Sequence, residues 1–255
     1  MRAHLALAVV AIFVCGACAT AQSEKKELSH KERARMLIDI ANGALNEGDA
    51  TGALVNLMAA EKEDEDLPEL HHSKALAFFA KHDLSTAIIE AKKAVELRQD
   101  YSDANNTLGK LLMDADKPLE AIAPLTRAAK DPLYRESYKA LTNLGILNYR
   151  RAEYTQAETN LSDAITAAPA AACVAYYYRG HLRLREARFN EAANDYDHAG
   201  KRLCAGFADA QLAVGIAYER SKQYELARKK FVEVQERYPN TKVAEQAVQH
   251  LRSLP

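Results

Sequence analysis

Apolar residues recur along this chain at the spacing of an amphipathic helix, in one segment after another. Within most segments they stand three or four residues apart, which places them on one helical face. Ser29 and Glu32 have the spacing of a capping box ahead of the apolar Met36, so helical structure is predicted to begin there. No segment is convincing as a strand, and the pattern therefore predicts an all-α fold.

The helical pattern repeats. A small residue on one helix is followed twelve residues later by an alanine on the next, which lets the two backbones approach closely. Successive second-helix alanines lie 34, 34, 36, 35 and 35 residues apart. They are Ala53, Ala87, Ala121, Ala157, Ala192 and Ala227. Their period is the tetratricopeptide spacing and predicts a right-handed superhelix of six helix pairs.

The repeats are predicted to fill a single domain over residues 22–255, with the six pairs at about 29–240. Positions four and seven residues after each alanine should share its buried face, because i, i+4 and i+7 coincide on a helix. Residues 133–137 lengthen one joint and account for the 36-residue step. Val243, Ala247, Val248 and Leu251 form a last apolar stripe, which predicts a capping helix at 241–253.

The composition and the motifs exclude several classes of function. A hydrophobic content of 48% and a net charge of −1 describe an ordinary globular chain without the basic excess that nucleic acid requires. No glycine-rich phosphate loop follows a strand, and no Ser, His and Asp set has a supporting motif. We therefore expect no catalytic residue, no cofactor and no metal, and a monomer that binds protein.

The first 21 residues have the pattern of an export signal. Arg2 precedes an apolar run over residues 5–14, which is too short for a permanent membrane span. Small residues then precede Cys18 as in a lipoprotein box, although Cys15 stands where an aliphatic residue is usual. Cys18 is the predicted lipidation site. Ala19 follows it instead of the aspartate of an inner-membrane retention signal, which favours the outer membrane.

A second cleavage site remains open. Ala19, Thr20 and Ala21 form an A-x-A sequence, and cleavage there would release a soluble periplasmic protein that starts at Gln22.

Two further cysteines flank one helix pair. Cys173 starts the first helix of the fifth unit and Cys204 follows the end of its second helix, so antiparallel packing brings them together. An exported chain meets an oxidising compartment, and we expect a Cys173–Cys204 disulfide. Two independent buried thiols are the alternative.

A narrower resemblance lies at the long joint and at the end of the chain. Residues 131–135, which lead into Asn143, Leu144 and Gly145, are similar to the corresponding joint of the type IV pilus pilotins, the PilF, PilW and Tgl family. The sequence of residues 234–239 also resembles the last repeat of that family. The export signal, the cysteine and the six repeats follow the same plan.

The resemblance implies an outer-membrane lipoprotein that promotes assembly and stability of the pilus secretin. Stacked first helices would form a concave, largely apolar groove for a partner segment. Mapping the repeat register onto this chain places these residues along it: His72, Phe79, Asn106, Lys110, Met113, Thr142, Ile146, Tyr149, Tyr177, His181, Leu184, Leu212 and Ile216. Some of them, Ile146 especially, would on the alternative interpretation pack between units. A periplasmic adaptor for another envelope complex, such as one containing cell-wall hydrolases, is the alternative function.

Overall fold

The computed structural model describes residues 28–255, and this part of the chain consists of thirteen α-helices and one short 3₁₀ helix, without a strand. Twelve helices form six consecutive pairs, and the all-α prediction is confirmed. The pairs are α1 (His30–Asn46) with α2 (Ala50–Glu63), α3 (Pro68–Ala80) with α4 (Leu84–Leu97), α5 (Ser102–Asp114) with α6 (Pro118–Lys130), α7 (Ser137–Arg150) with α8 (Tyr154–Ala167), α9 (Cys173–Arg185) with α10 (Phe189–Ala199), and α11 (Ala208–Arg220) with α12 (Tyr224–Arg237). Helix α13 (Lys242–Ser253) closes the stack as the predicted cap, and η1 (Arg202–Cys204) lies between α10 and α11.

The predicted export signal, the lipidation site Cys18 and the alternative cleavage before Gln22 lie outside the described residues.

Helix starts follow from local side chains. The hydroxyl of Ser29 accepts from the backbone N–H of Glu32, whose carboxylate accepts from the backbone N–H of Ser29, so the predicted capping box is present. Asp49 caps α2 and Asp83 caps α4 in the same way, each accepting a backbone N–H three residues on. Capping satisfies backbone donors that the first turn of a helix leaves free.

The turn inside each pair repeats one backbone conformation. Five residues before each second-helix alanine, the chain has a positive φ of 56–63° at a non-glycine residue, or 84° at Gly48. These residues are Gly48, His82, Asp116, Ala152, Ala187 and Lys222. A left-handed residue just beyond the C-terminus reverses a helix abruptly. The backbone conformation therefore repeats with the same period as the sequence.

The core follows the predicted face. All six second-helix alanines are fully buried, and so are the residues four positions later: Leu57, Ala91, Leu125, Leu161, Tyr196 and Phe231. In the third to sixth pairs, a glycine on the first helix meets this side chain. A Cβ on Gly145 would lie 2.6 Å from the side chain of Leu161, so only glycine leaves room. The close approach within each pair thus uses the small residues that the sequence singled out.

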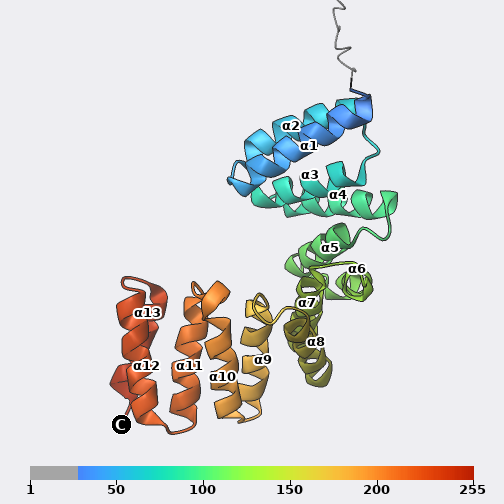
Figure 1. Cartoon of the computed structure of the whole chain (residues 1–255). Coiled ribbons are helices and arrows are strands. Elements are labelled where there is room, and N and C mark those ends of the chain that lie inside the picture. Colours follow the sequence, from blue (N-terminus) through green and yellow to red (C-terminus); the bar gives the residue numbers. More distant parts are fainter. Residues whose placement is uncertain (1–27) are drawn as a thin grey trace, which may run out of the picture.

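The pairs follow a curved path, which bends in the region of α7 and α8 (Figure 1). First helices contact one another from α1 through α9, but α9 and α11 make almost no direct contact. Helix α10 has 11 residues, fewer than the 13 or 14 of α9 and α11–α12, and α11 packs on both α10 and α12. The row of first helices is therefore interrupted before the sixth pair.

Candidate functional site

The predicted groove residues all lie on first helices, on positions other than the small residues that face the second helices. His72, Asn106 and Tyr177 each stand three positions before such a small residue, while Lys110 and His181 directly follow one. From α3 to α9, predicted groove residues on neighbouring first helices lie close together. They form one polar region around His72, a second polar region around Asn106 and an aromatic region around Tyr177.

Three of the predicted groove residues are buried within the chain. Thr142, Ile146 and Leu212 are only 6–8% exposed, and the hydroxyl of Thr142 donates to the backbone oxygen of Tyr138 at 2.7 Å. Tight packing between neighbouring repeats covers them. Thr142 also lines a pocket, which is described below, whereas Ile146 and Leu212 pack in the core.

The stretch between α1 and α5 centres on His72. Its Nδ1 lies 3.2 Å from the Tyr101 hydroxyl, and its Nε2 lies 3.0 Å from the Thr107 hydroxyl. Burial lowers the pKa of His72 to about 4, against weaker opposing effects of nearby carboxylates, so the ring is neutral near pH 7. A pocket of about 330 Å³ opens here and is bordered by the carboxylates of Asp39 and Glu69.

A second pocket, of about 360 Å³, lies between α5, α7 and the start of α9. Asn106 and Lys110 line it from α5, and Thr142 and Asn143 from α7. The side-chain amide of Asn143 donates to that of Asn106 at 3.0 Å. Asn143 belongs to the Asn-Leu-Gly motif of the sequence but is not among the predicted groove residues. Its position on a first helix, two residues before the small residue Gly145, could have indicated that it faces the same side.

Beyond this pocket the surface becomes aromatic. The ring centroid of Tyr177 lies 4.4 Å from that of His181 and 4.7 Å from that of Phe207. Tyr149 lies 5.8 Å from Tyr178, so α7 and α9 share the cluster. Burial raises the pKa of Tyr177 and lowers that of His181, which keeps both side chains uncharged at neutral pH. Half-buried aromatic rings of this kind suit an apolar partner segment.

The side chains on either side of the interruption belong to different core clusters. Phe207, just before α11, packs with the cluster that includes Tyr177. Leu184 packs with the core cluster of α10 and α11, while Ile216 belongs with the cluster around α12 and α13. Contacts between consecutive first helices, on which the predicted groove depends, therefore run from α1 to α9.

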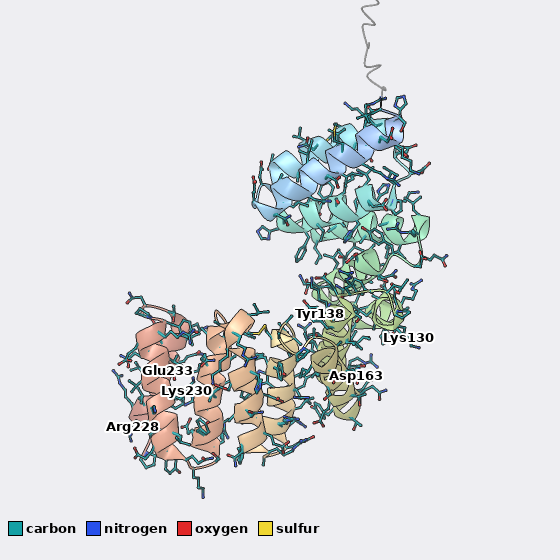
Figure 2. All side chains as sticks on the ribbon, in the orientation of Figure 1. Lys130, Tyr138, Asp163, Arg228, Lys230 and Glu233 are labelled. Carbon is teal, nitrogen blue, oxygen red and sulfur yellow. A yellow bond between two sulfur atoms is a disulfide. The ribbon has the colours of Figure 1, made fainter. Side chains whose placement is uncertain are left out.

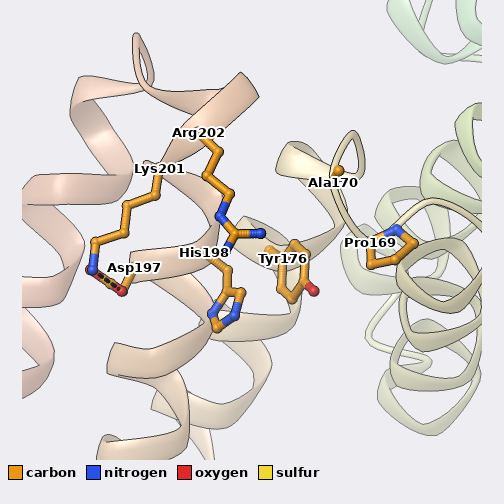
Figure 3. Close-up of a pocket in the computed structure, with 7 residues that line it drawn as sticks. All are labelled: Pro169, Ala170, Tyr176, Asp197, His198, Lys201 and Arg202. Atoms are coloured by element: carbon orange, nitrogen blue, oxygen red, sulfur yellow. Dashed lines mark ion pairs between the residues drawn. The ribbon is translucent and has the colours of Figure 1, made fainter.

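Cys173 and Cys204 are joined by a disulfide, with their Cα atoms 5.6 Å apart. The bond ties the start of α9 to η1 across the end of the fifth pair. Beside it lies a pocket of about 450 Å³, which Figure 3 shows between Pro169, Tyr176 and the side chains of His198 and Arg202. The Tyr176 and His198 rings stack at 5.0 Å. Sequence reasoning did not find this pocket, because it depends on how the chain folds after α10.

Several charged side chains serve the fold. Asp195 is fully buried and receives Arg179 through two hydrogen bonds of 2.8 and 2.9 Å, with Arg183 at 2.8 Å. Lys230 and Glu233 pair at 3.1 Å on α12 (Figure 2). Buried ions persist only when they are paired in this way.

Within residues 28–255, no three His, Cys, Asp or Glu side chains gather closely enough to hold a metal ion. His71 is buried, with its Nδ1 2.6 Å from Glu90. None of the helices in the same range has the length and apolarity to cross a membrane.

Comparison with known proteins shows the fold. No family model and no curated protein matches this sequence. Among solved structures, that of PilW, described as a widely conserved type IV pilus biogenesis factor, matches with a TM-score of 0.76 at 18% identity and covers 84% of this chain and 98% of PilW. Pseudomonas aeruginosa PilF matches with a TM-score of 0.74 at 20% identity, over 87% of this chain and 99% of PilF.

A third solved structure is similar over a smaller share of this chain. YrrB, described as a TPR protein with an unusual peptide-binding site, matches with a TM-score of 0.55 at 19% identity, over 76% of this chain and 97% of YrrB. The pairing of the helices, the length of the repeat and the likeness to these solved structures all indicate the same fold. The chain is therefore a tetratricopeptide-repeat protein that has the fold of the type IV pilus biogenesis factor PilW and of PilF.

Proposed function

We propose that this protein is a type IV pilus biogenesis factor, and more specifically an outer-membrane lipoprotein that helps secretin subunits assemble into a stable ring. One observation carries the proposal: the described stack covers PilW and PilF almost from end to end, with the same course of the superhelix. YrrB superimposes less well over a smaller share of this chain. The export signal and Cys18 in the sequence support delivery to the outer membrane.

The surface suits binding and not catalysis. The row of first helices from α1 to α9 offers two pockets and an aromatic cluster within one continuous face. A partner segment laid along this face would bury apolar side chains on the tyrosines around α9 and meet polar groups nearer α5. Holding a secretin segment in this way would keep its apolar surface from aggregating before the ring forms.

Deleting the gene tests the role. We expect heat-resistant secretin multimers to disappear from the outer membrane and to return when the gene is supplied in trans. Normal multimers after deletion would reject the pilotin and leave an adaptor for another envelope complex, such as one with cell-wall hydrolases.

Anchoring has a separate test. Mass spectrometry of the mature protein should find acyl chains on an N-terminal Cys18. A mature chain that begins with unmodified Gln22 would instead make the protein soluble and contradict the lipid anchor.

A further inference from the structure

We propose that a pocket at the open end of the third helix pair, away from its internal turn, binds a primary ammonium group on a lysine side chain of the partner protein. The pocket holds about 420 Å³ and contains none of the predicted groove residues. It lies between the start of α5, the end of α6 and the joints beside them, and its lining includes Asp100, Ser102, Asn105, Arg127, Asp131 and Leu133. The inference goes beyond the proposed function and rests on it only in that the partner is a protein.

A buried oxygen without a donor belongs to this pocket. Asn105 is only 1% exposed, and its side-chain NH₂ group donates to the backbone oxygens of Gln99 at 2.8 Å and Tyr101 at 2.9 Å. These two acceptors fix the orientation of the amide, because the reversed amide would place its oxygen against both. Oδ1 is then left without a hydrogen-bond donor among residues 28–255. Since an unsatisfied buried acceptor costs free energy, the position favours a ligand that brings an N–H group.

In two other pairs the equivalent side chain has its partner within the chain. Gln211, four residues before the small residue of α11, accepts from the ammonium group of Lys230, three residues after the second-helix alanine. His71 and Glu90 occupy these two positions in the second pair, with 2.6 Å between their side chains. In the third pair the second position is Pro124, whose side chain has neither a donor nor an acceptor. The third pair therefore keeps the acceptor and lacks the ammonium group that the sixth pair supplies.

The carboxylates of the pocket suit a cation. Asp131 accepts from the Ser102 hydroxyl at 2.5 Å and from the backbone N–H of Leu133 at 2.9 Å. These hydrogen bonds, chiefly the one from Ser102, lower the pKa of Asp131, so its carboxylate is ionised at neutral pH. Asp100 is exposed, and neither carboxylate has a cation within 4 Å in the described part of the chain. Both are therefore available to an ammonium group from outside.

Arg127 gives the proposal a sign that can be tested. It lines the pocket, is exposed, and has no carboxylate within 4 Å among residues 28–255, Asp131 included. An ammonium group that enters the pocket would be repelled by this guanidinium, because like charges oppose each other. An anion would instead bind to it. Loss of the Arg127 charge should therefore strengthen the binding of an ammonium group and weaken the binding of an anion.

Leu133 favours a lysine side chain as the source of the ammonium group. It is 87% exposed in the long joint between α6 and α7, two residues after Asp131. A lysine side chain packs its methylene groups along apolar surface while its charged end reaches polar atoms. The stem would cover Leu133 and the ammonium group would meet the carboxylates and Asn105. An α-ammonium group at a chain terminus has no such stem.

The experiment uses the mature, disulfide-bonded protein and three small probes. The first is Nα-acetyl-lysine N-methylamide, whose only charge is the side-chain ammonium group. In the second probe this group is acetylated, and the third is leucine amide, which has an α-ammonium group. Each is titrated into ¹⁵N-labelled protein at low salt while the side-chain amide of Asn105 and the backbone N–H of Leu133 are followed. We expect saturable shifts with the lysine probe, at least tenfold weaker binding of the acetylated probe and at least threefold weaker binding of leucine amide.

Charge variants separate this pocket from the general charge of the protein. Asp100→Asn should weaken the lysine probe at least threefold, and Arg127→Gln should strengthen it at least twofold. Asp114, exposed at the other end of α5 and without an ion pair in the described range, is the matched control for Asp100. Asp114→Asn removes the same charge and should change binding less than 1.5-fold.

Pro124→Lys tests the comparison between the pairs. It supplies an ammonium group from within the chain, as Lys230 does in the sixth pair, and should abolish binding of the lysine probe. Pro124→Ala adds no charge and should retain binding. Circular dichroism establishes that both variants are folded, and if Pro124→Lys does not fold, Asp100→Asn and Arg127→Gln decide.

Each outcome decides the matter. Equal binding of the lysine probe and its acetylated form, no saturable shift at 50 mM probe, or weaker binding by the Arg127→Gln protein would overturn the proposal. Leucine amide that binds as tightly as the lysine probe would overturn the assignment to a lysine side chain. In cells, secretin multimers that vanish on deletion but persist with Pro124→Lys would reject this pocket as the docking point while leaving the pilotin role. Normal multimers after deletion, with binding of the lysine probe intact, would reject the pilotin and leave the site.

Discussion

At the scale of single residues, the helix pairs depend on glycines that face large buried side chains. Gly180 on α9 lies against the ring of Tyr196 on α10, and the Tyr196 hydroxyl is 2.8 Å from Nδ1 of His181. The ring is fully buried and fixed at its tip, so it has little room to move aside. Packing at native density makes such a site sensitive to a single added methyl group.

Gly180→Ala should destabilise the protein by about 1–3 kcal/mol, although alanine favours a helix, because overpacking in a fixed core costs that much. The added Cβ would lie 2.6 Å from the Tyr196 ring. Denaturant unfolding measures the change. Gly43→Ala is the matched control, since nothing lies within 4 Å of its added Cβ, and it should stabilise by up to ~1 kcal/mol through helix propensity. Equal effects at both positions would contradict the packing argument.

His72 should make stability depend on pH. Its pKa is lowered to about 4 in the fold, while an unfolded histidine titrates near 6.5, so the unfolded chain takes up the proton first as pH falls. Stability is fully present above about pH 6.5 and should decrease by up to ~3 kcal/mol on acidification to pH 4. His72→Gln should flatten this part of the profile. Parallel wild-type and variant curves between pH 6.5 and 4 would refute the assignment.

At the scale of elements, all six pairs share the same internal turn, and the fifth pair differs in its second helix and in the joint that follows it. Its second helix is short, and the joint that follows contains Gly200 and the 3₁₀ helix η1, whereas the joints between the other described pairs contain no helix. The buried Asp195 holds Arg179 and Arg183 across the pair, and the disulfide closes its open end. This pair therefore carries covalent and ionic restraints of its own, at the point where the row of first helices is interrupted.

Removing the disulfide should cost about 3–4 kcal/mol, because opening a loop of this size restores conformational entropy to the unfolded chain. The two cysteines are 31 residues apart. Unfolding with and without a reductant measures the loss, and the Cys173→Ser, Cys204→Ser double variant should be as unstable as the reduced wild type and insensitive to the reductant. A wild-type protein whose free energy of unfolding is unaffected by the reductant would show that the disulfide does not contribute to stability.

At the scale of the whole molecule, the stack has an apolar end that α13 covers. Ala247 is fully buried, and the His250 ring stacks on Phe231 at 4.9 Å. The carboxylate of Glu219 on α11 lies 2.7 Å from Nδ1 of His250. A solenoid buries each repeat only against its neighbours, so its last unit needs such a cap.

Truncation after Thr241 should lower the free energy of unfolding by ~3 kcal/mol or more, since it exposes Phe231, Val234 and Leu212 to water. Aggregation that increases with concentration should accompany it, as seen by light scattering. Gln249→Ala, at an exposed position of α13, should change stability by less than ~0.5 kcal/mol. A truncated chain as stable as the full one would show that α13 is no cap.

The sequence itself determined the repeat. The spacing of Ala53 through Ala227, the capping box at Ser29 and the face four residues after each alanine all follow from helical periodicity, and the structure confirms them. These features could be predicted because i, i+4 and i+7 contacts are local: the residues that make them are set by the geometry of one helix.

Which first-helix residues are exposed follows from how the repeats pack in three dimensions. Ile146 and Leu212 have the same register as groove positions but are covered by neighbouring repeats, while Asn143 lines a pocket that sequence reasoning did not assign to it. Exposure at these places depends on the angle between successive pairs and on the weak contact between α9 and α11. Those angles come from packing among many side chains, so no local pattern in the sequence encodes them.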